Sequence, residues 1–254
     1  PSSRAPVPAV DLYGRTLVLF LHKIIGHEAE QLVQTAGDFY QAALPFLKCS
    51  IAKQRSSTNA RLKQGEIIFG ADADHSIKEN GIMYAIDLLM NQDASFYLDT
   101  RGARAWLKTH SKDKTVLNTF AYTGSMGVAA LVGGAQQVTQ IDRNGKFIRL
   151  AQESAQLNQL EQTRMTCKAV DFFVAVGQMK HNGQVFDTVI LDPPFFSITE
   201  RGRVDQANEA TRLINKARPL LKDGGELLVV NNALYLSGQE FIQGLEAAGR
   251  NGFI

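Results

Sequence analysis

The stretch TVLNTFAYTGSMGVAALV, residues 115–132, decides the fold, because it runs from an apolar segment through a glycine turn into a series of small residues. We interpret 115–119 as a buried strand and 125–132 as the helix after it. The same alternation recurs downstream, with strands expected at 137–141, 164–169, 186–191 and 226–230, and helices at 146–158, 172–179, 204–221 and 238–248. Five strands alternating with helices predict an α/β fold with a mostly parallel, doubly wound sheet.

The first third of the chain has a different pattern. We expect a strand at 16–21, an amphipathic helix at 28–44 and two further strands at 66–69 and 82–86. This order is typical of a small α+β domain. The sequence therefore predicts two domains, 1–90 and 91–254.

Composition limits the classes of protein to consider. The 254 residues have a formal net charge of +2 and are 44% hydrophobic, an ordinary balance for a globular protein. Cys49 and Cys167 are too few for a disulfide framework or a cysteine-based metal site. The apolar run at 16–21 is too short to cross a bilayer. We expect a cytoplasmic protein without membrane segment or metal, and the sequence leaves the oligomeric state open.

Polar residues follow successive strands of the predicted sheet. The first strand runs into the glycine turn, and the next three are followed by Asp142, Asp171 and Asp192. Ligands of an open parallel sheet bind beyond the carboxyl ends of its strands, and an acid at the position of Asp142 can accept hydrogen bonds from ribose hydroxyls. The pattern favours a nucleoside-bearing cofactor. Alternatively, the glycines serve packing, and Asp142 and Asp171 cap helices.

The glycine pattern also bears on which cofactor binds. A dinucleotide site requires G-x-G-x-x-G, and the aligned positions here are Tyr122, Gly124 and Gly127. The missing first glycine argues against NAD. An NAD(P)-dependent oxidoreductase nevertheless stays as a second enzyme class, supported by the two glycines and Asp142.

Taken together, these motifs resemble the S-adenosylmethionine (SAM) motifs of class I methyltransferases. The segment YLDTR at 97–101 resembles the YLDxR signature of bacterial large-subunit rRNA cytosine-C5 and guanine-N7 methyltransferases, and VDLYG at 10–14 resembles the VDRYG segment of the cytosine-C5 group. The resemblance implies a Rossmann-like methyltransferase domain, SAM as cofactor and RNA, namely rRNA, as partner. The family's PUA domain and its last two strands are absent from this sequence, so we expect a truncated form.

The resemblance also implies roles for individual residues. Tyr122 to Gly124 would line the methionine end of SAM, Asp142 would hold the ribose and Asp171 the adenine amine, while Asp99 and Arg101 would close over the cofactor. The full set of implied cofactor-binding residues is Asp99, Arg101, Asn118, Phe120, Tyr122, Thr123, Gly124, Ser125, Asp142, Asp171, Phe172 and Asp192. Alternatively, Asp99 is a helix N-cap, and Arg101 and Arg104 lie on a solvated helix face.

The stretch VILDPPFF, residues 189–196, resembles the D/N-P-P-F/Y signature of enzymes that methylate exocyclic amines. Asp192 and Pro193 each precede a proline, which holds them extended. A carboxylate and a carbonyl can together accept the hydrogens of an amine and aim its lone pair at the methyl group. We predict that Asp192, Pro193 and Phe195 are catalytic, with Phe195 stacking on a flipped base. The alternative is that Phe195 and Phe196 plug the core.

Methylation of cytosine C5 instead requires a cysteine thiolate. The cytosine-C5 enzymes carry a cysteine after the fifth strand, where this chain has Asn231 and Asn232, a pair that resembles the guanine-N7 members. Cys49 and Cys167 are interpreted as small buried residues. Carbon-5 chemistry is therefore the runner-up, to be tested by whether a cysteine lies within reach of Asp192.

The segment 48–63 contains five basic residues and no acid. It could track RNA phosphates or be an ordinary solvated surface. We predict a SAM-dependent methyltransferase acting on a guanine nitrogen or an exocyclic amine of rRNA. A non-catalytic RNA-binding protein remains a third possibility.

Overall fold

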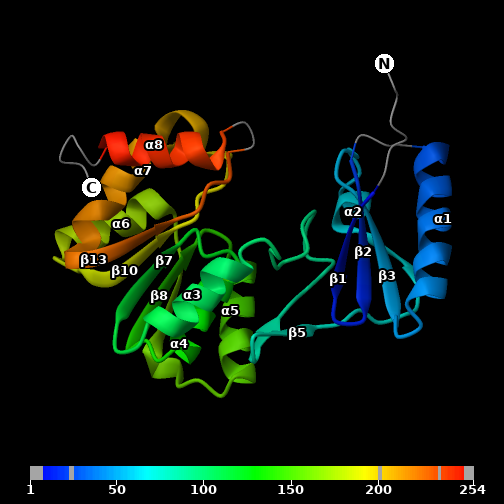
Figure 1. Cartoon of the computed structure of the whole chain (residues 1–254), viewed down its shortest axis with the longest axis horizontal. Helices are drawn as coiled ribbons and strands as arrows, with labels where there is room; N and C mark the ends of the chain where they lie inside the picture. The colour runs from blue at the N-terminus through cyan, green and yellow to red at the C-terminus, as the bar shows by residue number, and fades with distance from the viewer. Residues whose placement is uncertain (1–7, 23–25, 200–201, 234–235, 249–254) are drawn as a thin grey trace. The chain divides into compact units, whose positions relative to one another are not determined.

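The computed structural model describes residues 8–22, 26–199, 202–233 and 236–248, and it divides the chain into two compact units (Figure 1). The first unit ends at Leu98 and the second begins at Asp99. This division comes later in the chain than the boundary expected near residue 91, because the segment that follows residue 90 is hydrogen-bonded to the first unit. The Lys53 ammonium donates to the carbonyls of Asn91 and Asp93, and the Tyr13 hydroxyl donates to the carbonyl of Phe96.

The first unit is an α+β domain built on a sheet of order β1-β2-β3-β4. Strands β2 and β3 are parallel, and the other two pairs are antiparallel. Helix α1 connects β2 to β3 and packs on the apolar side chains of Leu17 and Leu19. The elements of this unit are β1 (Ala9–Tyr13), β2 (Thr16–Leu21), α1 (His27–Ala43), β3 (Cys49–Gln54), α2 (Ala60–Gln64), β4 (Glu66–Phe69), β5 (Ser76–Glu79) and β6 (Ile82–Ala85).

The basic segment 48–63 is mostly engaged within this unit. Lys53 lies on β3 with no exposed surface, and its ammonium donates to three backbone carbonyls, those of Gln64, Asn91 and Asp93. Lys48 pairs with Asp74 at 3.1 Å, Arg55 with Asp93, and Arg61 with Glu66 at 3.0 Å. Lys53 is therefore neither a phosphate contact nor part of a solvated surface, and acids pair with Lys48, Arg55 and Arg61.

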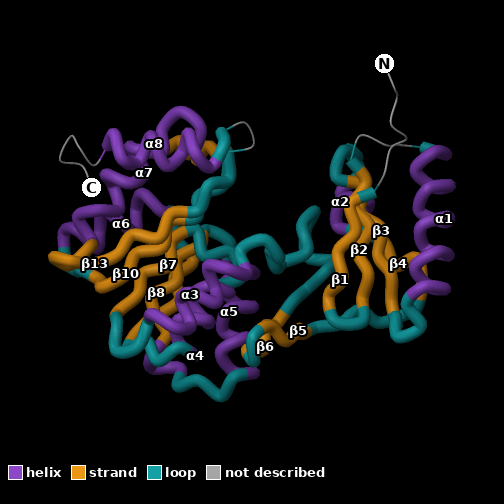
Figure 2. The backbone as a smooth tube through the Cα atoms, in the orientation of Figure 1, coloured by secondary structure: helices purple, strands orange, loops and turns teal. Residues whose placement is uncertain are grey.

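The second unit contains a sheet (Figure 2). It has five strands in the order β13-β10-β7-β8-β9, and each neighbouring pair is parallel. Its strands are β7 (Thr115–Thr119), β8 (Gln137–Asp142), β9 (Met165–Ala169), β10 (Phe186–Leu191) and β13 (Leu221–Val229). Its helices are α3 (Arg101–His110), α4 (Ser125–Val132), α5 (Gly145–Leu157), α6 (Phe172–His181), α7 (Gln206–Ala217) and α8 (Gly238–Ala248), with short 3-10 turns at Gln162–Arg164 and Arg218–Leu220. The predicted parallel, doubly wound α/β fold is confirmed.

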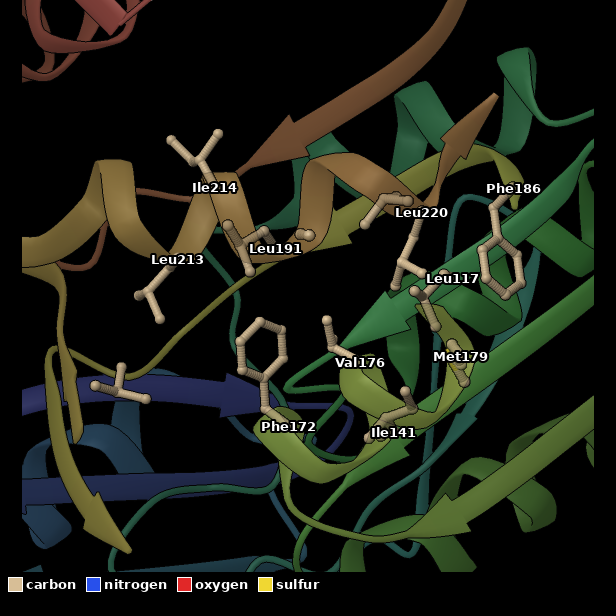
Figure 3. Close-up of a cluster of buried hydrophobic side chains, with 14 residues drawn as sticks. Leu117, Ile141, Phe172, Val176, Met179, Phe186, Leu191, Leu213, Ile214 and Leu220 are labelled. Carbon is tan, nitrogen blue, oxygen red and sulfur yellow. The ribbon is translucent and has the colours of Figure 1, made fainter. Parts of the chain in front are cut away.

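Helices cover both faces of this sheet. On one face, α6 and α7 bury a cluster of apolar side chains that includes Leu117, Ile141 and Leu191 from three different strands (Figure 3). Because side chains alternate along a strand, the neighbouring residues Asn118 and Gln140 belong to the other face, where α4 packs. This core holds the carboxyl ends of β7, β8 and β10 in a fixed relation.

One predicted element is wrong in part. The helix expected at 204–221 is split, because Val204 belongs to β12 (Gly202–Asp205), which forms an antiparallel hairpin with β11 (Phe196–Thr199). Pro219 lacks the N–H that a helix interior needs, so α7 ends at Ala217. Phe196 is 50% exposed on this hairpin, so it does not plug the core. Among the described residues, none of the helices is long and apolar enough to cross a membrane.

Candidate functional site

The chain order of the strands reverses between β7 and β10, which lie side by side in the middle of the sheet. This topological switch point is where open α/β sheets bind ligands, beyond the carboxyl ends of the strands. The loop after β7 begins at Phe120, and the loop after β10 begins at Asp192. The glycine turn and the Asp192-Pro193-Pro194 motif therefore lie at adjacent strand ends.

The loop between β7 and α4 has an unusual backbone. Phe120, Tyr122 and Gly124 all have positive φ, at 53°, 51° and 74°. Left-handed conformations in residues other than glycine cost ~1–3 kcal/mol and concentrate at functional sites. The end of β8 holds this shape, since Ala121 N–H donates to the carbonyl of Ile141 and Tyr122 N–H donates to Asp142 Oδ2 at 2.9 Å.

Gly124 of this loop and Gly127 of α4 are needed for packing on the sheet. A Cβ atom at Gly124 would lie 2.6 Å from Gln140 Nε2, and one at Gly127 would lie 2.5 Å from Gln140 Oε1. The buried Gln140 amide accepts from Asn118 Nδ2 at 2.8 Å and donates to the carbonyl of Gly124. The alternative of glycines that serve packing is therefore supported, and Asn118 supports the loop from beneath.

Asp142 is the last residue of β8 and uses both carboxylate oxygens. Oδ2 accepts from Tyr122 N–H, and Oδ1 accepts from Asn144 N–H at 2.8 Å. Burial raises the pKa of this carboxyl, while the hydrogen bonds from Asn144 and Tyr122 act in the opposite direction. Asn144, not Asp142, caps α5. A carboxylate has about four lone-pair positions, and the N–H of Arg143 also donates to this one, so Asp142 keeps acceptor capacity for a ribose hydroxyl.

Asp171 and Phe172 follow β9. Asp171 is the N-cap of α6, where its Oδ1 accepts from Phe173 N–H at 2.9 Å, so the capping alternative is supported for this residue. Phe172 is buried and stacks on Phe120 with ring centroids 4.6 Å apart. This stack packs the loop after β7 against the first residue of α6.

Asp192 follows β10, and Asn232 contacts it from the segment after β13. Asn232 Nδ2 donates to Asp192 Oδ1 at 2.7 Å and to the carbonyl of Pro193 at 2.9 Å. Burial raises the pKa of the Asp192 carboxyl to about 6; the Asn232 hydrogen bond opposes this shift and the charge of Asp99 adds to it. A carboxyl with a strongly raised pKa at a sheet's ligand-binding edge is typical of a functional group.

Gln206, which the sequence analysis did not identify, holds this arrangement together. Its buried side chain accepts from Asn232 N–H at 2.6 Å and donates to the carbonyl of Val230, and its own N–H donates to the carbonyl of Phe195 at 3.1 Å. Gln206 is the first residue of α7. It therefore joins the loop after β10 to the segment after β13.

The remaining predicted residues lie at the amino ends of α3 and α4. Asp99 directly precedes Thr100, the N-cap of α3, and is not itself the cap. Arg101 is exposed at the first position of α3, whereas Arg104 is 1% exposed and donates to Thr100 Oγ1 at 2.6 Å, so a solvated face is wrong for Arg104. Thr123 is buried in the loop, and Ser125 begins α4.

The two thiols are poorly placed for catalysis. Cys49 is fully buried in the first unit. Cys167 lies on β9, three strands from β10, about 14 Å at the usual strand spacing. Burial raises the pKa of both thiols, that of Cys167 to about 11. Within the described ranges, no group of three or more His, Cys, Asp or Glu side chains is arranged to hold a metal ion.

The sequence also matches known proteins. The family model for S-adenosylmethionine-dependent methyltransferases matches residues 53–251. A ribosomal RNA large subunit methyltransferase I of Pseudoalteromonas translucida is 36% identical over 183 residues, 69% of this chain and 46% of the relative. The protein of that name from Yersinia pseudotuberculosis is 32% identical over 235 residues, 89% of this chain and 58% of the relative. The chain thus spans about half the length of these curated relatives.

Solved structures share the fold. The crystal structure of SMU.776 complexed with SAH superposes with a TM-score of 0.83 at 24% identity, covering 94% of this chain and 61% of that one. The complex of aTrm5 and tRNALeu gives a TM-score of 0.64 at 18% identity, covering 95% and 63%. Because the family match is to methyltransferases, the alternative of an NAD(P)-dependent oxidoreductase is given up. The chain belongs to the S-adenosylmethionine-dependent methyltransferase family.

Proposed function

We propose that this chain transfers the methyl group of SAM to a base of large-subunit rRNA, at a guanine nitrogen or an exocyclic amine. The relatives named ribosomal RNA large subunit methyltransferase I support the choice of RNA. An rRNA substrate would also agree with the expected cytoplasmic location.

The observation that carries the proposal is the position of Asp192 and Pro193. They follow β10 at the switch point, beside the loop between β7 and α4. Phe195 follows in the same loop and is partly exposed, and its ring would stack on a base taken out of the helix. Acceptors and an aromatic ring thus lie together where the fold binds its ligands.

Residues around the switch point fit SAM. The cofactor supplies an already activated methyl group on its sulfonium. The loop from Tyr122 to Gly124 would hold the methionine end, Asp142 the ribose and Asp171 the adenine, while Asp99 and Arg101 would close over them. The role of Asp142 is supported by the acceptor capacity that its carboxylate keeps. The role of Asp171 is supported by its second carboxylate oxygen, since only Oδ1 caps α6.

Cytosine-C5 chemistry remains the alternative, but neither thiol favours it. A nucleophilic cysteine has to be a thiolate within bonding distance of the base. Cys167 has a pKa of about 11 and lies three strands from Asp192, and Cys49 is fully buried. Transfer to a nitrogen atom needs no such nucleophile.

The test has two stages. Calorimetric titration with SAM, its demethylated product and NAD should show binding of the first two only, and binding should be weakened in Asp142→Ala. The chain is then incubated with labelled SAM and unmodified large-subunit rRNA. Label in the RNA supports the proposal. SAM binding without any transfer to RNA would instead favour the non-catalytic alternative.

A further inference from the structure

The side chain of Asn232 occupies the acceptors that sequence analysis assigned to the substrate. Its amide nitrogen, Nδ2, donates one hydrogen to Asp192 Oδ1 at 2.7 Å and the other to the Pro193 carbonyl at 2.9 Å. This is the hydrogen-bonding pattern expected of an exocyclic amine on a base. The protein therefore already contains a donor for this pair of acceptors.

The orientation of the Asn232 amide is fixed by chemistry. A carbonyl such as that of Pro193 can only accept, so the atom 2.9 Å from it has to be the nitrogen of the amide. The main chain of Asn232 is held as well, because its N–H donates to Gln206 Oε1 at 2.6 Å. With both amine hydrogens used, the only hydrogen-bonding atom that the side chain retains is Oδ1, an acceptor.

Asp192 likewise retains only an acceptor. Its Oδ1 accepts from Asn232, and an ionised carboxylate has no hydrogen to donate, so Oδ2 can only accept. Two side chains beyond the ends of the neighbouring strands β10 and β13 therefore offer acceptors and no donor. A base edge that meets them has to supply N–H groups.

We propose that Asn232 is a specificity-determining residue, and that Asn232 Oδ1 and Asp192 Oδ2 together accept the two hydrogens of an exocyclic amine. This inference rests on the proposed function and narrows it. The N7 edge of guanine presents two acceptors, N7 and O6, and would place acceptor against acceptor. The amino groups of adenine, cytosine and guanine present the required hydrogens.

The first test identifies the methylated nucleoside. In vitro transcribed large-subunit rRNA is incubated with the full chain and deuterated-methyl SAM, digested to nucleosides and analysed by mass spectrometry. The label is expected on an exocyclic amine. Labelled 7-methylguanosine or 5-methylcytidine would overturn this inference and leave the methyltransferase function intact. Absence of label from every nucleoside, with SAM binding retained, would overturn the proposed function itself.

The second test examines Asn232 directly. Asn232→Ala removes both the donor and the acceptor, and we expect kcat to fall ~10–100-fold with little change in the Kd for SAM. The variant also loses the hydrogen bond that lowers the pKa of Asp192, while Asp99 still raises it, so the acid limb of the pH–rate profile should move to higher pH. A loss of folded protein alone would lower the rate at every pH without moving that limb.

The matched control is Asn231→Ala. The Asn231 amide donates to the carbonyl of Leu236 and accepts from Ala233 N–H, and it has no hydrogen bond to Asp192. This variant should keep the pH–rate profile of the wild type. Wild-type kcat and an unshifted profile in Asn232→Ala would overturn the assignment. Because product identity is measured on the wild type, it decides the inference even if Asn232→Ala does not fold.

Discussion

Replacing Asp192 with asparagine is expected to make the fold more stable while abolishing methyl transfer. Asparagine has the shape of a protonated aspartate, and its Oδ1 can still accept from Asn232 Nδ2. The substitution therefore removes a negative charge that burial disfavours and retains the hydrogen bond. Stability and activity should change in opposite directions, as is typical of functional sites.

The magnitude follows from the pKa. Folding raises the pKa of the Asp192 carboxyl from 3.8 to about 6, so the folded protein binds this proton more tightly than the unfolded chain. The contribution of this group to stability therefore falls as the pH rises from 3.8 to 6, and it stays low above that range. About two pKa units at 1.36 kcal/mol each give Asp192→Asn a gain of at most ~3 kcal/mol at pH 8. At pH 5 the gain should shrink to about half of this value, because most of the wild-type carboxyl is then protonated in the folded state.

Urea denaturation of the wild type and of Asp192→Asn at pH 8 and pH 5 measures both quantities. The variant should have the higher free energy of unfolding at pH 8, and its advantage should decrease at pH 5. A variant that is less stable than the wild type at pH 8, or equally more stable at both pH values, would refute the reasoning. Methyl transfer by the same samples should be lost.

Three further predictions concern other parts of the site unit. Gly127→Ala places a Cβ 2.5 Å from Gln140 Oε1 and should lower the free energy of unfolding by ~1–3 kcal/mol. Gly177→Ala, in an exposed position of α6 with open space around it, should raise the free energy of unfolding by ~0.5–1 kcal/mol. Urea denaturation measures both changes. Burial alone would raise the pKa of Asp187, but hydrogen bonds from Lys222 and Thr115 lower it to about 2. The ionised carboxylate therefore stabilises the fold above pH 4, and this effect is lost as the pH falls towards 2. Asp187→Asn should lower the free energy of unfolding by ~2 kcal/mol at pH 7 and by almost nothing at pH 2. Cys167→Ser should retain methyl transfer to rRNA within about twofold, and a loss of transfer with SAM binding intact would restore cytosine-C5 chemistry.

Local sequence signals predicted most of the second unit. Strands such as 186–191 are short apolar runs bounded by turn residues, and the acids that follow them mark the carboxyl edge of a parallel sheet. The hairpin at 196–205 was not predicted, because its pairing of Phe196 with Asp205 depends on tertiary structure. Strand β3 was not predicted either. Lys53 within CSIAKQ indicates an exposed position, because a lysine is rarely buried. Its burial depends on the carbonyls of Asn91 and Asp93, which are distant in sequence.

The polar contacts of the site were the hardest to anticipate. Gln140 and Gln206 belong to no motif, and the resemblance of the pair Asn231-Asn232 to the guanine-N7 members did not indicate its hydrogen bonds. Gln140, Gln206 and Asn232 each act through partners more than 15 residues away. Sequence analysis placed Asp192 at the strand end but could not show that Asn232 already bonds to it. The separations between these residues explain the failure, since periodicity and spacing report only local structure.

The most direct test compares wild type with Asp192→Ala for transfer of labelled methyl from saturating SAM to unmodified large-subunit rRNA. The wild type should label the RNA, and Asp192→Ala should bind SAM yet leave the RNA unlabelled. Equal labelling by the two proteins would contradict a catalytic site built on Asp192.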